Sequence, residues 1–318
     1  VGMANSRKML FDEEGIELDA DWKDHLMTNG DKADLAVFIG RMRDLNLSNS
    51  IFVDNTANDK IAGYYAGILD DSISISTPNK VANSSSYLQY QRLKSIANKR
   101  GVQFHYDTNV GAGLPIISTL RDLMDSGDQI RKIEGVLSGS LSFIFNNFDG
   151  IRPFHEIVSG AKEKGFTEPD PSIDLSGKDV GRKILILARE TGVPMETEHI
   201  ELKGFLPVGA MEAESVDDFF SLLEKNADYF TKLHTDASAE GKVLRMIATL
   251  EGDQASVGVQ AVGPENPFHG LSGSDNMVVF TTDRYNERPL VVRGPGAGAE
   301  VTAAGVFAEI IKIGKFLS

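Results

Sequence analysis

Residues 165–183 concentrate side chains that could move a proton, with several carboxylates followed by a lysine. Two prolines in this segment fix the local backbone and favour an extended chain before each of them. Glu168 and Asp170, which precede these prolines, are therefore expected on a stiff loop. The histidines are scattered without metal-ligand spacing, and no serine stands in a nucleophile elbow. Lysine and carboxylates are thus the candidates for proton transfer.

A helix is predicted over residues 179–190, and it carries Asp179 and Lys183 four residues apart on one face. Most pairs of this kind are exposed ion pairs worth about 0.2–0.5 kcal/mol. Here a proline-stiffened acidic loop precedes the helix, and Asp174 lies between the loop and the pair. We therefore interpret the two residues as sharing a ligand, with a solvated ion pair as the alternative.

Two further candidates follow predicted strands. Lys80 comes shortly after the strand of residues 73–76, and Thr56 comes after the strand of residues 51–53. In open α/β sheets, ligands bind beyond the carboxyl ends of the strands, so both residues are placed where a ligand would lie. The alternatives are an exposed loop lysine and a cap of the next helix.

Two glycine-rich loops are a third feature. Residues 107–115 follow the next strand, and their small residues would let main-chain carbonyls converge on a monovalent cation or let a ligand approach closely. A plain tight turn explains the composition equally well. Residues 294–298 lead into the last helix, where a phosphate could bind or the chain could pack closely.

The composition excludes several classes of protein. The chain has 318 residues, 41% of them apolar, so it can fill two domain cores. A net charge of −14 disfavours nucleic-acid partners, and no cysteine is available for a disulfide or a thiolate. No stretch approaches the roughly 20 apolar residues that span a bilayer, so no membrane partner and a cytoplasmic location are expected.

Helical patterns and short apolar runs alternate through the first hundred residues, which predicts βαβ units around a parallel sheet. The expected helices cover residues 31–47, 58–69 and 86–99, and the expected strands cover residues 51–53, 73–76 and 102–106. The elements expected after these are a helix over residues 114–124, a strand over 130–137, a helical stretch over 141–230, four strands within 242–262 and 277–293, and a helix over 301–316. We predict a Rossmann-like doubly wound sheet in residues 1–109, with residues 301–318 packed on it, and an α+β domain with a mixed sheet in residues 110–300.

Together these segments resemble homoserine dehydrogenase, in detail the dehydrogenase part of the bifunctional aspartokinase–homoserine dehydrogenases. The resemblance runs in order along the chain and rests on residues 54–56, 77–80, 107–115, 137–142, 165–183 and 294–298. Residues 4–6 and 107–110 suggest the bifunctional subtype. A covalent fusion to an upstream aspartokinase is therefore implied.

The resemblance implies interconversion of aspartate 4-semialdehyde and homoserine with NADPH or NADH, on the route to threonine and methionine. Lys183 would donate the proton to the carbonyl oxygen as hydride arrives, and Lys80 would contact the substrate or the reacting oxygen. Glu168 and Asp179 would bind the substrate's amino group, with Asp174 supporting them. A homodimer or higher homo-oligomer built through the central sheet is also implied.

The resemblance also assigns residues to the cofactor and to a metal. Thr56, Lys80 and Gly298 would line the nicotinamide side. Asn5 and Arg7 are assigned to cofactor binding, and a 2′-phosphate contact by Arg7 or Lys8 would favour NADP over NAD. Main-chain groups of Val110, Ala112 and Leu114, together with the Asp107 position, would hold a sodium ion.

One feature departs from the resemblance. A dinucleotide fold opens with a strand, a G-x-G-x-x-G turn and a helix that binds the pyrophosphate. Residues 1–3 resemble the end of the second strand, so the first strand, turn and helix are expected to be missing from this chain. A non-catalytic structural or regulatory fragment is therefore one alternative. An oxidoreductase of a related semialdehyde is another, although the lack of cysteine argues against phosphorylating aldehyde dehydrogenases.

Overall fold

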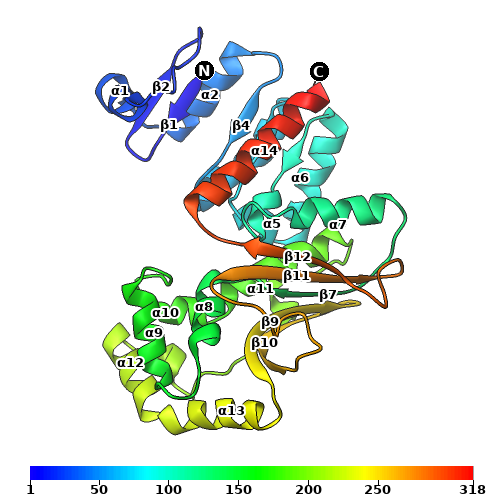
Figure 1. Ribbon diagram of the computed structural model, residues 1–318. Coiled ribbons are helices and arrows are strands. Elements are labelled where there is room, and N and C mark those ends of the chain that lie inside the picture. Colours follow the sequence, from blue (N-terminus) through cyan, green and yellow to red (C-terminus); the bar gives the residue numbers. More distant parts are fainter. Residues whose placement is uncertain (318) are drawn as a thin grey trace.

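The computed structural model describes residues 1–317, which form three sheets surrounded by helices (Figure 1). The elements of the first part are β1 (Gly2–Ala4), β2 (Lys8–Phe11), α1 (Trp22–Asn29), β3 (Asp31–Lys32), α2 (Leu35–Leu45), β4 (Ile51–Val53), α3 (Asp59–Ala62), α4 (Tyr65–Asp70), β5 (Ser74–Ser76), α5 (Val81–Ser84), α6 (Tyr87–Arg100) and β6 (Phe104–His105). Within the described residues, no helix combines the length and the apolar character needed to cross a membrane.

The predicted parallel sheet is confirmed. Strands β4, β5 and β6 pair in parallel in that order, and α4 and α6 connect them. The helix expected over residues 58–69 is split into α3 and α4 around Gly63, a residue of low helix propensity. The helix expected from residue 31 begins at Leu35, because Asp34 accepts a hydrogen bond from the Val37 main-chain N–H and caps it.

The N-terminal strands differ from the prediction. Strand β1 pairs antiparallel with β2, and β2 pairs with β3, in a sheet of their own. Residues 1–3 are therefore not paired with the parallel sheet, contrary to the expectation. The cause is local: the side-chain oxygen of Asn5 accepts hydrogen bonds from the main-chain N–H groups of Arg7 and Lys8, each 2.8 Å long, and this closes a tight turn between β1 and β2.

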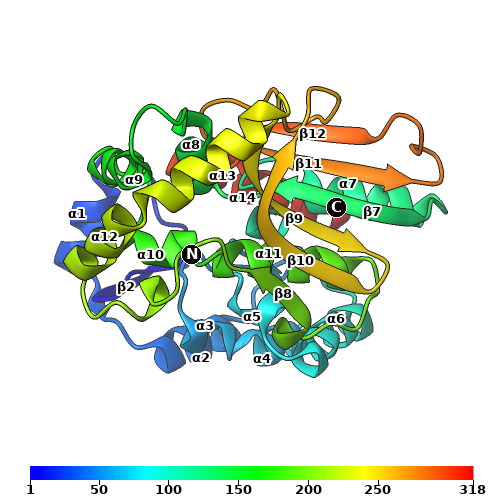
Figure 2. The ribbon, with the colours of Figure 1, turned by 90° about the horizontal axis from the view of Figure 1, so that it is seen from below.

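A mixed sheet forms the centre of the second part, as predicted. The elements here are the short 3₁₀ turn η1 (Asp107–Asn109), α7 (Ile116–Asp125), β7 (Ile130–Val136), α8 (Gly139–Asn147), α9 (Phe154–Glu163), α10 (Pro171–Leu175), α11 (Lys178–Glu190), β8 (Ile200–Lys203), α12 (Val216–Lys225), α13 (Ala227–Ala239), β9 (Val243–Glu251), β10 (Gln254–Val262), β11 (Asp275–Thr282), β12 (Leu290–Pro295) and α14 (Ala299–Leu317). The strand order is β12-β11-β7-β9-β10-β8, and only the β10–β8 pairing is parallel. Helices α9, α10, α12 and α13 gather to one side of this sheet (Figure 2).

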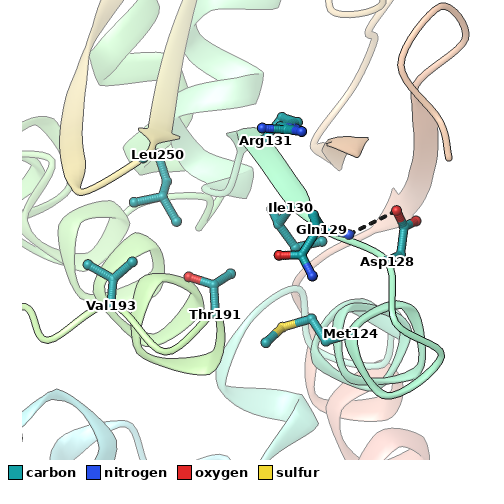
Figure 3. Close-up of a pocket in the computed structure, with 9 residues that line it drawn as sticks. Met124, Asp128, Gln129, Ile130, Arg131, Thr191, Val193 and Leu250 are labelled. Atoms are coloured by element: carbon teal, nitrogen blue, oxygen red, sulfur yellow. Dashed lines mark hydrogen bonds between the residues drawn. The ribbon is translucent and has the colours of Figure 1, made fainter. Parts of the chain in front are cut away.

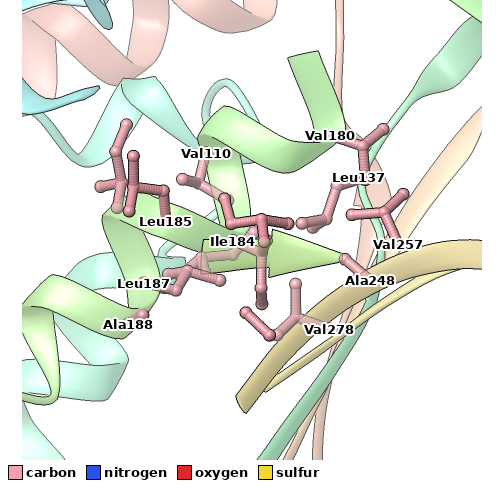
Figure 4. Close-up of a cluster of buried hydrophobic side chains, with 14 of the residues drawn as sticks. Val110, Leu137, Val180, Ile184, Leu185, Leu187, Ala188, Ala248, Val257 and Val278 are labelled. Carbon is pink, nitrogen blue, oxygen red and sulfur yellow. The ribbon is translucent and has the colours of Figure 1, made fainter. Parts of the chain in front are cut away.

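Helix α11 lies between the two parts of the molecule. It contacts β9 and β10 on one side and α5 and α7 on another, so residues 184–188 are all buried. Figure 4 shows Val180 and Ile184 among Ala248, Val257 and Val278 of the sheet. The apolar face predicted for this helix therefore packs on the mixed sheet, and this packing fixes where its first turn can lie.

The last helix, α14, returns to the parallel sheet. The buried carboxylate of Glu309 accepts hydrogen bonds from Ser76 Oγ at 2.6 Å and from the Thr108 main-chain N–H at 3.0 Å. The start of α14 lies so close to the glycine-rich turn that a Cβ on Gly113 would come 2.6 Å from the Val301 carbonyl oxygen. The glycines of this turn thus permit the close approach of a helix.

We predict that Gly113→Ala destabilises the protein by about 1–3 kcal/mol, because the added methyl group meets backbone that cannot move aside. The matched control is Gly160→Ala in α9, where an added Cβ meets no atom within 4 Å. That change should stabilise the helix by up to about 1 kcal/mol. Urea unfolding of both variants tests the contact, and equal effects of the two substitutions would contradict it.

Candidate active site

Lys183 lies in the second turn of α11 with a side chain that is only 12% exposed. Its Nζ is 2.8 Å from the Oδ2 atom of Asp179, one turn earlier, and it donates a 2.7 Å hydrogen bond to the Leu137 main-chain oxygen. Leu137 follows the last residue of β7. The lysine is therefore held between its own helix and the end of a strand.

Lys80 reaches the same carboxylate from the other part of the molecule. It precedes α5, just beyond the carboxyl end of β5, and its Nζ is 3.5 Å from Oδ1 of Asp179. The side chain of Asp179 is 52% exposed, so the cluster is open on one side. The alternative for Asp179 and Lys183 was a solvated ion pair within one helix. The structure differs from it, because Lys183 is largely buried and Asp179 also contacts Lys80.

The charges in the cluster shift its pKa values. Burial on its own would raise the pKa of Asp179, but the ammonium groups of Lys183 and Lys80 outweigh it and hold that pKa at about 2. Burial lowers the pKa of Lys80; Asp179 opposes this shift and Lys183 adds to it. The carboxylate is therefore ionised at any pH near neutrality.

Asp174 organises the acidic loop. Its Oδ2 accepts a hydrogen bond of 2.9 Å from the Glu168 main-chain N–H, and its Oδ1 accepts one of 2.7 Å from Ser140 Oγ. The carboxylate of Glu168 is exposed and has no hydrogen bond or ion pair with any residue between 1 and 317. Asp174 thus fixes the backbone of Glu168 and leaves the Glu168 side chain available.

A buried network fixes the loops that follow β4 and β5. Asp54, only 2% exposed, accepts hydrogen bonds from the Tyr65 hydroxyl at 2.6 Å and from Asn79 Nδ2 at 3.0 Å. The hydroxyl of Thr77 donates to the Asp54 main-chain oxygen at 2.8 Å, and the Thr56 N–H donates to Oδ1 at 2.9 Å. Asp54 therefore sets the positions of Thr56 and of the loop that carries Lys80.

Two family models match the chain in succession. The model described as "Homoserine dehydrogenase, NAD binding domain" matches residues 5–107, and the model described as "Homoserine dehydrogenase" matches residues 115–311. Between them they include the lysine–carboxylate cluster. The chain belongs to the homoserine dehydrogenase family. The resemblance seen in the sequence is thereby confirmed.

Curated relatives agree with this assignment. "Bifunctional aspartokinase/homoserine dehydrogenase 2, chloroplastic" of Zea mays is 43% identical over 320 residues, which cover 100% of this chain and 35% of the relative. "Homoserine dehydrogenase" of Schizosaccharomyces pombe is 43% identical over 274 residues, which cover 83% of this chain and 72% of the relative. The chain thus spans about a third of the length of the bifunctional proteins it matches.

Solved structures share the fold. A Candida auris protein described as of unknown function superposes with a TM-score of 0.88 at 35% identity, over 98% of this chain and 88% of that chain. A hyperthermophilic archaeal homoserine dehydrogenase in complex with NADPH gives a TM-score of 0.74 at 23% identity, over 99% of this chain and 87% of that chain. At that identity the second likeness shows the fold alone.

The cofactor residues expected of a homoserine dehydrogenase are only partly brought together. A hollow of about 1290 Å³ lies between the N-terminal strands and β4, and Asn5 and Thr56 line it. Arg7, Lys80 and Gly298 are not among its lining residues. Gly298 has a φ of 115°, and no atom lies within 4 Å of the place a Cβ would occupy, which leaves open space before α14.

The residues expected of a homoserine dehydrogenase sodium site lie on one turn. Ala112 has a φ of 52°, and Oδ1 of Asp107 is buried without a hydrogen-bond partner among residues 1–317. The other oxygen, Oδ2, is 2.9 Å from Lys312 Nζ. The main-chain oxygen of Leu114 accepts a hydrogen bond from Ile116. Part of the predicted ligand set is thus already used by the protein itself.

Two functional contacts were missed at the sequence level. The Leu137 carbonyl, which holds Lys183, and the Ser140 hydroxyl, which holds Asp174, both follow β7. The sequence signal was present: Ser138 caps α8 directly after a predicted strand, where ligand sites gather. From the sequence, Ser138 and Ser140 were rejected as nucleophiles and counted in residues 137–142, one of the segments that carry the resemblance, with no contact predicted for them.

A second, smaller cavity of about 190 Å³ lies at the far end of α11 (Figure 3). Its lining includes Met124, Thr191, Val193 and Leu250. It contains none of the candidate site residues.

We predict that the Asp179 carboxylate titrates near pH 2, below its ordinary value of 3.8. A depressed pKa means that the attraction to the two lysines is complete above pH 3.8 and is lost as the pH falls toward 2. Lys183→Ala should raise this pKa more than Lys80→Ala does, because Lys183 contributes the larger effect. Carbon-13 NMR titration of the carboxyl group measures both shifts. The reverse order would contradict the geometry.

Proposed function

We propose that this chain catalyses the interconversion of L-aspartate 4-semialdehyde and L-homoserine with NADPH or NADH. The observation that carries the proposal is the cluster of Lys80, Asp179 and Lys183, which joins the nucleotide-binding part to the mixed-sheet part. Family membership supports the reaction type, and the cluster supports the named roles.

Lys183 is the proposed proton donor to the carbonyl oxygen. An ammonium group has three N–H donors, and here one is used by Asp179 and one by the Leu137 oxygen. The third is free for the substrate oxygen. In the direction of reduction, a bound nicotinamide would supply hydride to the carbonyl carbon. Lys183 then gives a proton to the oxygen, and its charge stabilises the developing alkoxide.

The carboxylates are proposed to hold the substrate's amino group. Asp179 is ionised and half exposed, and the free carboxylate of Glu168 lies on the loop that Asp174 fixes. Lys80, across the cluster, would contact the substrate or the reacting oxygen. A substrate whose ammonium is held by two carboxylates has less freedom to move its carbonyl away from Lys183, so these contacts would orient the substrate as well as bind it.

We propose NADP as the cofactor, with NAD as the alternative. The hollow along β4 is lined by Asn5 and Thr56 and is large enough for part of a dinucleotide, and the space at Gly298 would admit the nicotinamide side. Arg7 is exposed on the turn between β1 and β2 and would meet a 2′-phosphate.

A sodium ion at the turn of residues 107–115 also belongs to this proposal. The orphaned Oδ1 of Asp107 and the positive φ of Ala112 fit a bound cation. Main-chain oxygens of Val110, Ala112 and Leu114 would complete its ligands, Leu114 through the lone pair that Ile116 leaves unused. Such an ion would hold the turn against α14 and would take no part in hydride or proton transfer.

We further propose a homodimer built through the mixed sheet, and a covalent fusion to an upstream aspartokinase. The outer strands of the sheet support the dimer, because Leu202 on β8 and Val291 on β12 are large apolar side chains left 44% and 42% exposed. The bifunctional relatives support the fusion. Sedimentation equilibrium on the isolated chain tests the dimer, and a monomer at micromolar concentration would contradict it.

We predict that Lys183→Ala lowers homoserine-dependent NADP reduction by at least about 100-fold, since general acid–base groups contribute about 10²–10⁴-fold. NADPH binding, measured by calorimetry, should change little. The control is Lys178→Ala, which removes an exposed lysine from the first turn of the same helix. Near-native turnover by Lys183→Ala would refute the proton-transfer role. No turnover by the unaltered chain would favour a non-catalytic fragment.

A further inference from the structure

The last turn of α11 carries two charged residues that the proposed chemistry does not use. Both contact the first part of the molecule, Arg189 through Asn83 and Glu190 through Tyr90. The side chain of Arg189 is 0% exposed, and its Nη1 donates a 2.8 Å hydrogen bond to the Asn83 main-chain oxygen. Asn83 belongs to α5, the four-residue helix that begins directly after Lys80.

Arg189 also organises the segment that follows α11. Its Nε and Nη2 donate to the Met195 main-chain oxygen at 3.0 and 2.9 Å, and Nη2 is 3.0 Å from the Glu196 carboxylate. The same carboxylate accepts hydrogen bonds from the Tyr87 N–H, the first residue of α6. The end of α5 and the start of α6 are therefore both tied to Arg189.

Glu190 fixes the same end of α11 to α6 and α7. Its carboxylate is 3% exposed and accepts hydrogen bonds of 2.7 Å from the Tyr90 hydroxyl and from Arg121 Nε. The ammonium of Lys94 is 3.3 Å away. Burial would raise the pKa of Glu190, but Arg121 and Lys94 hold it at about 2, so the charge persists.

Helix α5 is thus attached to α11 at both of its ends. Lys80 is 3.5 Å from Asp179 at one end, and Asn83 is 2.8 Å from Arg189 at the other. The Lys80 main-chain oxygen accepts 2.9 Å hydrogen bonds from the N–H and hydroxyl of Ser84, which link Lys80 to the last residue of α5. Asp179 and Arg189 are about 15 Å apart along the rigid rod of α11, at 1.5 Å per residue.

We propose that Arg189 is a positioning residue, whose bond to Asn83 holds Lys80 at its working distance from Asp179 and Lys183. The proposal rests on the proposed function. Arg189 touches neither substrate nor cofactor in this scheme. It acts through α5, and losing its planar fork of donors would let Lys80 move away from the reacting oxygen.

The chain contains a matched control. Arg245 on β9 is also buried, and its guanidinium also donates hydrogen bonds to main-chain oxygens, including those of Leu244, Phe268 and Leu271. All of these belong to the mixed-sheet part, so Arg245 joins nothing to Lys80. Arg→Lys at either position keeps the charge and removes the fork, and both changes weaken a buried network.

The first experiment measures homoserine-dependent NADP reduction in Arg189→Lys and Arg245→Lys. We expect Arg189→Lys to lower kcat about 10- to 100-fold, with the KM for NADP nearly unchanged, and Arg245→Lys to leave kcat within about twofold. In a Lys80→Ala background, Arg189→Lys should cause no further loss, because its effect passes through Lys80. Equal losses from the two arginine variants, or additive losses with Lys80→Ala, would overturn the proposal.

If Arg189→Lys does not fold by circular dichroism, Glu196→Gln replaces it, since this change weakens the anchoring of Arg189 at a 39% exposed partner. We expect a smaller loss of kcat that also disappears in the Lys80→Ala background. A loss that persists there would count against the proposal.

The second experiment does not require activity. The pH dependence of Lys80 labelling by an amine reagent, followed by mass spectrometry, reports the pKa of Lys80, which burial lowers in the native protein. Arg189→Lys should move it toward the ordinary lysine value, and Arg245→Lys should not. An unchanged titration in Arg189→Lys would overturn the positioning role. A shifted titration in a chain that cannot oxidise homoserine would refute only the proposed function.

Discussion

The packing of α11 against both parts of the molecule is the constraint on which the candidate site depends. Its apolar face is covered by β9 and β10, and its other side meets α5 and α7. A helix buried on nearly all sides cannot rotate or slide without opening a cavity, which costs several kcal/mol for each large side chain. Its first turn is therefore fixed where β5 and β7 end, and the lysines and carboxylates meet there.

The charges of the lysine–carboxylate cluster determine which chemistry it can support. Two ammonium groups share one carboxylate, so the immediate cluster of Lys80, Asp179 and Lys183 carries an excess positive charge. The two ammonium groups keep Asp179 ionised, whereas burial lowers the pKa of Lys80, with Asp179 opposing that shift and Lys183 adding to it. A place with spare positive charge beside a fixed proton donor suits an oxygen that becomes negative during reaction.

Buried polar networks hold the loops around this point. Asp54 ties the ends of β4 and β5 together, and Glu309 on α14 ties β5 to the turn at Thr108. Glu190 connects the far end of α11 to α6 and α7 through hydrogen bonds from Tyr90 and Arg121. Each of these carboxylates is nearly inaccessible to water, so its oxygens need hydrogen-bond partners from the protein. Those hydrogen bonds form in only one arrangement of the surrounding loops, which fixes the loop positions.

The sequence by itself determined the order and type of most elements, because the alternation of apolar and polar residues is a local property. It also determined the candidate proton-transfer residues, since Asp179 and Lys183 share a helical face and Lys80 follows a strand. Only the tertiary structure brings Lys80 to Asp179, the Leu137 oxygen to Lys183 and the Ser140 hydroxyl to Asp174. Those contacts join residues tens of positions apart in the sequence, and no local periodicity encodes them.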